Sequence, residues 1–167
     1  MADHQNGETL ASNVRDLLRG RWLGHSQILL GSFHRCLGRH LIVRSGDAAD
    51  EALRLFGSSF AVLSHGTEAD PILNYANRTA LQLWELSTEQ LVMTPSRLTA
   101  EPVNREARQR FLQQANRQGF VEGYEGVRIS ARGRRFLIQN AIIWNVTSGE
   151  GAPLGQAATF DRWTPVA

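Results

Sequence analysis

The sequence predicts an α+β fold, a five-stranded antiparallel sheet with helices covering one of its faces, and an N-terminal helical extension over residues 1–57. Three observations predict it. Apolar residues recur at helical spacing over residues 10–41 and again between Thr99 and Gly119. After Gly119 the spacing changes to the alternation typical of strands. Between these regions, the run ILNYANRTALQLWEL at residues 72–86 carries a short strand straight into a helix.

The N-terminal extension is expected to contain two helices before a short third one. Apolar residues keep a three-and-four spacing over residues 10–41, and Gly24 is the expected division. The polar loop RSGDAAD at residues 44–50 then leads to a short helix over residues 51–56. The remaining residues, 58–167, are expected to form the sheet domain, and the whole chain one compact unit.

Two strands and two short helices are predicted next. The strands lie at residues 60–64 and just before Asn77, joined by a polar turn. Asparagine can cap a helix with its side-chain oxygen, so Asn77 is expected to begin the first helix. Ser87 and Gln90 match a capping box, which predicts a second short helix that Pro95 ends.

The longest predicted helix begins near Thr99 and Pro102, because threonine caps helices and proline is tolerated in a first turn. Its expected apolar face is Val103, Ala107, Phe111 and Ala115. Gly119 is the expected stop. Three strands follow, over residues 120–129, 135–146 and 154–163, with turns at residues 131–133 and 148–151.

Composition excludes several function classes. The chain has 167 residues and a net charge of +2, and all eighteen of its basic residues are arginine. The absence of lysine excludes Schiff-base catalysis and a Walker-type phosphate site. The arginines are scattered, and the group at residues 132–135 fits a strand turn, so we expect no direct contact with nucleic acid.

The sequence also indicates where in the cell the protein is found. Apolar stretches are too short for a membrane-spanning helix, and the polar start, Met1 to Glu8, is unlike a secretory signal. The lone Cys36 cannot form an intrachain disulfide. A cytoplasmic protein without a membrane partner is the expectation.

Four segments of the chain are distinctive, namely SHGTEADPILNYANRTALQLWELS, PSRLTAEPVNREAR, GVRISARGRRFLIQNAIIWNV and GQAATFDRW. In these segments the sequence resembles the MEKHLA domain family, which is related to the PAS sensor fold. The resemblance spans roughly residues 29–163. It implies a PAS-like, non-catalytic sensory or regulatory domain of signal transduction or transcriptional regulation, of the stand-alone bacterial kind. It also implies a homodimer, a protein partner in trans, and a cavity for a small molecule; it leaves the cofactor unknown.

Polar and aromatic residues near the expected cavity are the candidate ligand contacts, because an apolar pocket needs a few polar anchors. Asn140 is the first candidate, since strict alternation places it on one strand face with Phe136, Ile138, Ile142 and Trp144. Gln156 is similar to the strand glutamine of flavin-binding PAS relatives. The full candidate set is Asn140, Gln156, Trp144, Tyr75, Asn77 and Trp84. The alternative for the amides is a buried hydrogen bond without a ligand.

Other chemistries find less support. The cysteine motif of light-sensing PAS relatives is missing, although a flavin could bind without it. Cys36 and His40 would share a helix face, but they give only two metal ligands. Ser64, His65 and Asp70 crowd into one loop, unlike a hydrolase triad. No metal and no catalytic residue is therefore expected.

Two alternatives to a ligand sensor stay open. One is an isomerase-like enzyme on a cone-shaped α+β barrel, which needs an acid and a base at one apolar cavity. The other is a pure interaction module, for which Trp22, Phe33, Leu37 and Trp163 are candidate dimer-surface residues, unless they are buried on their own molecule.

Overall fold

The computed structural model describes residues 12–167, so the predicted helix start at Leu10 lies outside the described part. A helical segment at residues 12–19 comes first. The elements that follow are α2 (Arg21–Leu37), α3 (Ala48–Phe56), β1 (Ala61–His65), β2 (Leu73–Ala76), α4 (Arg78–Trp84), α5 (Thr88–Leu91), the 3₁₀ helix η1 (Ser96–Thr99), α6 (Pro102–Gln118), β3 (Phe120–Ile129), β4 (Arg135–Thr147), β5 (Pro153–Phe160) and β6 (Arg162–Val166).

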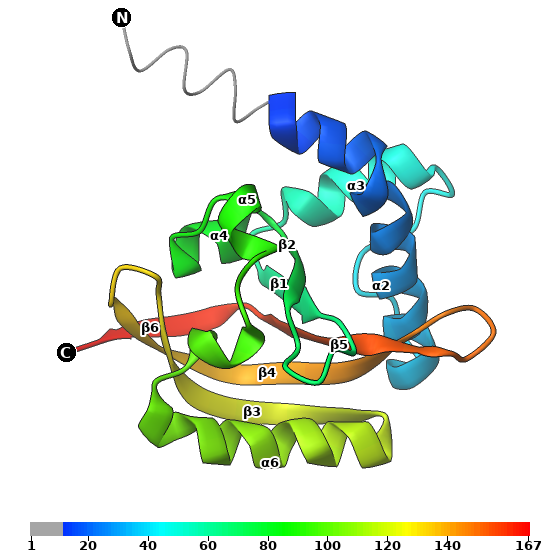
Figure 1. Ribbon diagram of the computed structural model, residues 1–167. Helices are drawn as coiled ribbons and strands as arrows, with labels where there is room; N and C mark the ends of the chain where they lie inside the picture. Colours follow the sequence, from blue (N-terminus) through cyan, green and yellow to red (C-terminus); the bar gives the residue numbers. More distant parts are fainter. Residues whose placement is uncertain (1–11) are drawn as a thin grey trace, which may run out of the picture.

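The strands form one antiparallel sheet in the order β2-β1-β5-β4-β3, with β6 also paired to β4 (Figure 1). The predicted α+β fold is confirmed. The last predicted strand, however, divides at Asp161 into β5 and β6. β5 pairs with the second half of β4, from Ile142 onward, whereas β6 pairs with its first half, up to Gln139.

Helices cover both faces of the sheet, whereas the sequence predicted helices on one face only. The face that α6 covers is called the inner face. There α6 packs against β3, with the rings of Phe111 and Tyr124 in an edge contact at 4.5 Å. On the outer face lies α2, since the Nε1 of Trp22 donates to the backbone oxygen of Asn74 in β2. Figure 1 shows these two helices on opposite sides of the strands. The N-terminal helices therefore pack on their own molecule.

Local signals explain where several helices begin. The side chain of Asn77 caps α4, and Ser87 with Gln90 forms the predicted capping box of α5. Pro102 occupies the first turn of α6, as predicted. The predicted break at Gly24 was wrong, because α2 runs through it and the break lies at Gly20. A glycine costs about 1 kcal/mol in a helix but does not end it.

The buried face of α6 also differs from the predicted one. Val103 is 79% exposed, whereas Arg108 and Ala115 are buried. The prediction counted only apolar residues, and the buried face is centred about one residue later, where it includes a charged side chain. Among residues 12–167, no helix is both long and apolar enough to cross a membrane.

Candidate functional site

A cavity of about 50 Å³ lies between the inner face of the sheet and the helices α4, η1 and α6. Its walls are mostly apolar. Ile138 and Ile143 come from β4, Ala158 and Phe160 from β5, and Trp84 from α4. Leu63 pairs with Ala158 across the sheet, and Ala158 pairs with Ile143. Because paired residues share a face, these side chains line one continuous apolar wall.

Two arginines face this cavity. Arg108 of α6 is 7% exposed and Arg128 of β3 is 6% exposed. The Nη2 of Arg108 donates to Ser96 Oγ at 3.0 Å. The Nη2 of Arg128 donates to the hydroxyl of Tyr124 at 2.6 Å, and its guanidinium lies 5.1 Å from the centre of that ring. Charged side chains are rarely so deeply buried without a partner of opposite charge.

The described residues supply no such partner. Neither Arg108 nor Arg128 forms an ion pair within residues 12–167, and the cavity lining contains no Asp or Glu. Burial, together with the positive charge of Arg128, lowers the pKa of Arg108 to about 10. The cavity therefore carries concentrated positive charge in a desolvated setting.

His65 is the third basic group at the cavity. Its Nδ1 donates to the backbone oxygen of Gly66 at 2.9 Å, which leaves Nε2 buried and without a hydrogen-bond partner among the described residues. Burial is the main cause that lowers the pKa of His65, with the charge of Arg108 adding to it. The imidazole is thus held neutral near pH 7.

The cavity adjoins a hollow on the surface. The hollow has a volume of about 430 Å³ and is bordered by α6, the β1–β2 loop and the start of β5. Both spaces are lined by His65, Ser96, Arg108, Leu112 and Gln156. A small molecule that reaches the cavity from this side has to pass these five side chains.

Two of the six predicted ligand contacts line the cavity. Trp84 lies against Phe136 and Phe160 with its ring edge on, at 5.1 and 6.0 Å. Gln156 lies at the mouth, where its Nε2 donates to the backbone oxygen of Leu112 at 2.8 Å and to Asn145 Oδ1 at 3.2 Å. Within residues 12–167, its side-chain oxygen accepts no hydrogen bond.

Tyr75 and Trp144 lie on the opposite face of the sheet, beneath α2. The ring of Tyr75 is 4.9 Å from that of Trp22. Trp144 donates from Nε1 to Ser32 Oγ at 3.1 Å and meets the edge of Phe33. Burial raises the pKa of Tyr75. Both aromatic residues belong to the packing of α2, and the expectation that they face the cavity was wrong.

Asn140 was also misplaced by the sequence pattern, because it is exposed and has a left-handed backbone with a φ of 52°. Gly126 pairs with Ile138 and Tyr124 pairs with Ala141, so β4 has one residue more than β3 across this stretch. That bulge contains Asn140 and shifts the alternation by one residue. Ile138 and Ile143 consequently share the inner face, and Asn140 lies outside the cavity.

Asn77 is fully used by the fold. Its Oδ1 accepts from the backbone nitrogens of Ala80 and Val62 at 3.1 and 3.0 Å. Its Nδ2 donates to the backbone oxygens of Leu55 and Phe60 at 3.3 and 2.8 Å. With both donors and both acceptor positions occupied, Asn77 ties α4, β1 and α3 together and does not line the cavity.

Arg108, Arg128 and Tyr124 were not among the residues predicted from the sequence. One signal pointed to them, since Arg108 precedes Leu112 by four residues on the inner side of α6. Tyr124 and Arg128 likewise lie four apart on one strand face. Recognising them required treating an arginine as a possible interior residue.

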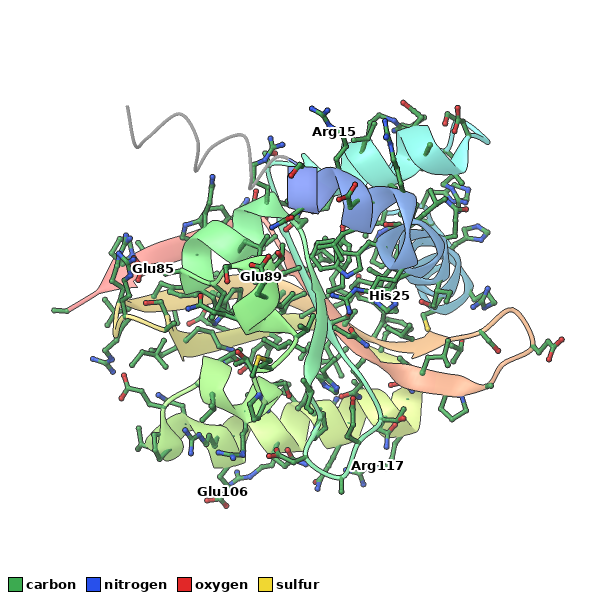
Figure 2. The ribbon with its side chains drawn as sticks, turned by 45° about the horizontal axis from the view of Figure 1, so that its top comes forward. Arg15, His25, Glu85, Glu89, Glu106 and Arg117 are labelled. Carbon is green, nitrogen blue, oxygen red and sulfur yellow. The ribbon has the colours of Figure 1, made fainter. Side chains whose placement is uncertain are left out.

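The other candidate chemistries can be placed as well. His40 lies beyond the end of α2, so it does not share a helix face with Cys36 as predicted. Within the described part of the chain, no three His, Cys, Asp or Glu residues gather as metal ligands would. The hydroxyl of Ser64 donates to Asn74 Oδ1 at 2.6 Å and lies 2.9 Å from Nε2 of His25. Figure 2 shows His25 on the side of α2 that faces the sheet.

Comparison with known proteins adds a family. The model of the MEKHLA domain matches residues 23–165. The homeobox-leucine zipper protein HOX32 of Oryza sativa subsp. japonica is 25% identical over 145 residues, which cover 86% of this chain and 16% of the relative. HOX10 of Oryza sativa subsp. indica is 28% identical over 135 residues, covering 80% and 16%. The chain thus spans about a sixth of the length of these relatives.

Solved structures share the fold at low sequence identity. A PAS domain from Colwellia psychrerythraea covers 70% of this chain, and 94% of its own chain matches, with a TM-score of 0.58 and 16% identity. An RNA-binding light-oxygen-voltage receptor covers 72% of this chain through 33% of its own, with a TM-score of 0.55 and 17% identity. The fold is therefore PAS-like.

Proposed function

Because the chain belongs to the MEKHLA domain family, we propose that it is a non-catalytic sensory domain that binds a small molecule in its interior cavity and signals to a partner protein. A PAS-like MEKHLA domain is a sensory domain of signalling proteins. The observation that carries the ligand proposal is the apolar cavity with its few inward polar groups, which opens toward a surface hollow.

The size of the cavity restricts the ligand. Sites for drug-sized molecules have volumes of about 300–1,000 Å³, whereas one water needs roughly 10–15 Å³ of such space. A cavity of about 50 Å³ suits a molecule of a few heavy atoms. A flavin or haem would require α6 or η1 to move away from the sheet.

A cavity-filling substitution tests the ligand proposal. Ala158→Leu places a larger side chain between Leu63 and Ile143. Native mass spectrometry and methyl NMR are recorded on protein with a library of small molecules. We expect a bound mass or shifts at the Ile138 and Ile143 methyls that disappear in this variant. Ala152→Leu, at an exposed position, is the matched control and keeps them.

A pure interaction module would behave differently. No compound in the library would then shift the Ile138 and Ile143 methyls, and that result would overturn the ligand proposal. The enzymatic alternative needs an acid and a base at the cavity. The described lining of the cavity contains no Asp or Glu that could serve as the acid, which favours the sensor.

We also propose that the protein associates with a second copy of itself as a homodimer. The predicted interface residues Trp22 and Phe33 are buried under the fold of their own chain, so a dimer has to use other residues. Trp163, which is partly exposed on β6, remains a candidate. Light scattering during size exclusion checks the mass, and a clean monomer at micromolar concentration would remove the dimer from the proposal.

A further inference from the structure

Two buried arginines without a carboxylate partner need an explanation. Arg108 and Arg128 are each more than nine-tenths buried and both line the cavity. Their like charges oppose one another, and burial removes the water that would screen them. Such an arrangement costs folding free energy, and an anion beside the two guanidinium groups would relieve that cost.

The hydrogen-bonding capacity of the two side chains is not exhausted. A guanidinium offers five N–H donors. Within residues 12–167, Arg108 makes one hydrogen bond, to Ser96, and Arg128 makes two, to Tyr124 and to the backbone oxygen of Val127. Arginine's planar fork matches the two oxygens of a carboxylate.

The rest of the cavity defines the other end of the ligand. Leu73, Ile138, Ile143 and Ala158 offer no hydrogen bonds and suit a short hydrocarbon chain. A strongly hydrated inorganic anion would leave this apolar wall without a complementary group. The volume of about 50 Å³ limits the chain to a few carbon atoms.

We propose that the cavity binds a small organic carboxylate, with its anionic end at Arg108 and Arg128 and its short apolar chain against Ile138 and Ile143. This inference rests on the proposed function, because it names the chemical class that the sensory cavity takes. Arg108 also borders the surface hollow, so the carboxylate meets it on the way in. Nothing else in the described cavity lining carries a full positive charge near pH 7.

Butyrate and butyramide provide a matched pair of probes, because they share a hydrocarbon chain and differ in charge. We expect butyrate to raise the melting temperature and to shift the Ile138 and Ile143 methyl signals, and butyramide to do neither. Arg108→Met should weaken butyrate binding roughly tenfold or more. Arg110→Met on the same helix is the control, since Arg110 is exposed and paired with Glu106.

The melting temperature measured without added ligand gives an independent test. Methionine keeps much of the volume of arginine but removes its charge, so Arg108→Met should melt at the same or a higher temperature than the wild type without ligand. A purely structural arginine would instead lower the melting temperature on replacement. Arg128→Met repeats the binding test should Arg108→Met fail to fold.

The outcomes separate this inference from the proposed function. Equal responses to butyrate and butyramide, or binding of neutral compounds alone, would overturn the carboxylate assignment and leave the sensory cavity intact. A response to inorganic phosphate without one to butyrate would also overturn it. The failure of every compound to shift the cavity methyls would overturn both.

Discussion

Single residues with several partners decide whether the elements of this protein meet. Asn77 is the clearest case, because one buried amide satisfies four backbone groups from three parts of the chain. The packing of α2 on the sheet depends on His25 of that helix, which lies against Ser64 and the ring of Tyr75. Neither side chain faces the cavity, so both can be altered without touching the proposed ligand site.

Asn77→Asp removes two donors while keeping the shape of the side chain. The carbonyl groups of Leu55 and Phe60 lose their partner and face a buried carboxylate instead. We expect the free energy of unfolding to fall by about 3 kcal/mol. Denaturant titration measures it. Asn140→Asp, at an exposed position, should change it little, and similar losses in both variants would contradict the role assigned to Asn77.

His25 makes stability depend on pH. Burial lowers the pKa of His25 from 6.5 to about 4. The unfolded chain therefore binds more protons between these values, so stability is full above pH 6.5 and is lost as the pH falls toward 4. The loss attributable to this group is roughly 3 kcal/mol.

Urea denaturation at several pH values checks this dependence. His25→Gln can still donate to Ser64 and should flatten the profile across that window. Some slope should remain, because the pKa of His65 is lowered as well. Parallel profiles for the variant and the wild type would show that His25 does not titrate as described.

At the scale of elements, irregular backbone positions bring β3, β4 and β5 into register with their neighbours. β4 gains one residue at Asn140, and β3 gains one between Val121 and Tyr124, where Gly123 has a φ of 74°. The two opposed bulges cancel, so pairing on either side remains regular. At the other end of the cavity, Gly155 of β5 approaches the backbone of His65 in β1 too closely for a side chain.

Gly155→Ala should therefore disturb the mouth of the cavity. A Cβ at this position would collide with the carbonyl group of His65, and the φ of 135° is one that side chains rarely adopt. We expect a loss of roughly 3 kcal/mol or more of stability. Gly149→Ala is the control, because a Cβ there meets nothing within 4 Å. Equal melting temperatures for the two variants would show that the strands can separate at little cost.

The sequence was informative for regular elements and their caps. The start of α4 at Asn77, the capping box of α5 and the span of α6 all follow from local chemistry. The bulge at Asn140 could not be predicted, because a one-residue insertion leaves no gap in an alternating pattern. Arg108 was missed for another reason, since a buried charge contradicts the usual pattern of an amphipathic helix.

At the scale of the whole molecule, one core joins both sides of the sheet. Trp22 and Phe33 of α2 belong to the same buried cluster as Trp84 and Ile138 on the cavity side. The outer helices also hold α3, because the buried Glu51 accepts a hydrogen bond from Gln27 of α2 and pairs with Arg44. We propose that the described part of the predicted N-terminal extension, residues 12–57, forms a single folding unit with the sheet.

Trp22→Ala tests this unity. Truncating a fully buried tryptophan should cost about 3–5 kcal/mol. Unfolding followed by circular dichroism and by NMR should remain one transition for the whole chain. Trp163→Ala, a matched change at a partly exposed position, should cost much less. Two separate transitions would show instead that residues 58–167 fold without the extension.

The placement of the tryptophans on the two faces of the sheet gives the protein separate optical reporters. Trp84 lies at the cavity, whereas Trp22 and Trp144 lie beneath α2. Indole emission depends on the polarity of its surroundings. A variant that retains Trp84 alone should change its emission when the cavity is filled, and one that retains Trp144 alone should respond when α2 loosens. Comparing the two would reveal whether events in the cavity reach the far side of the strands.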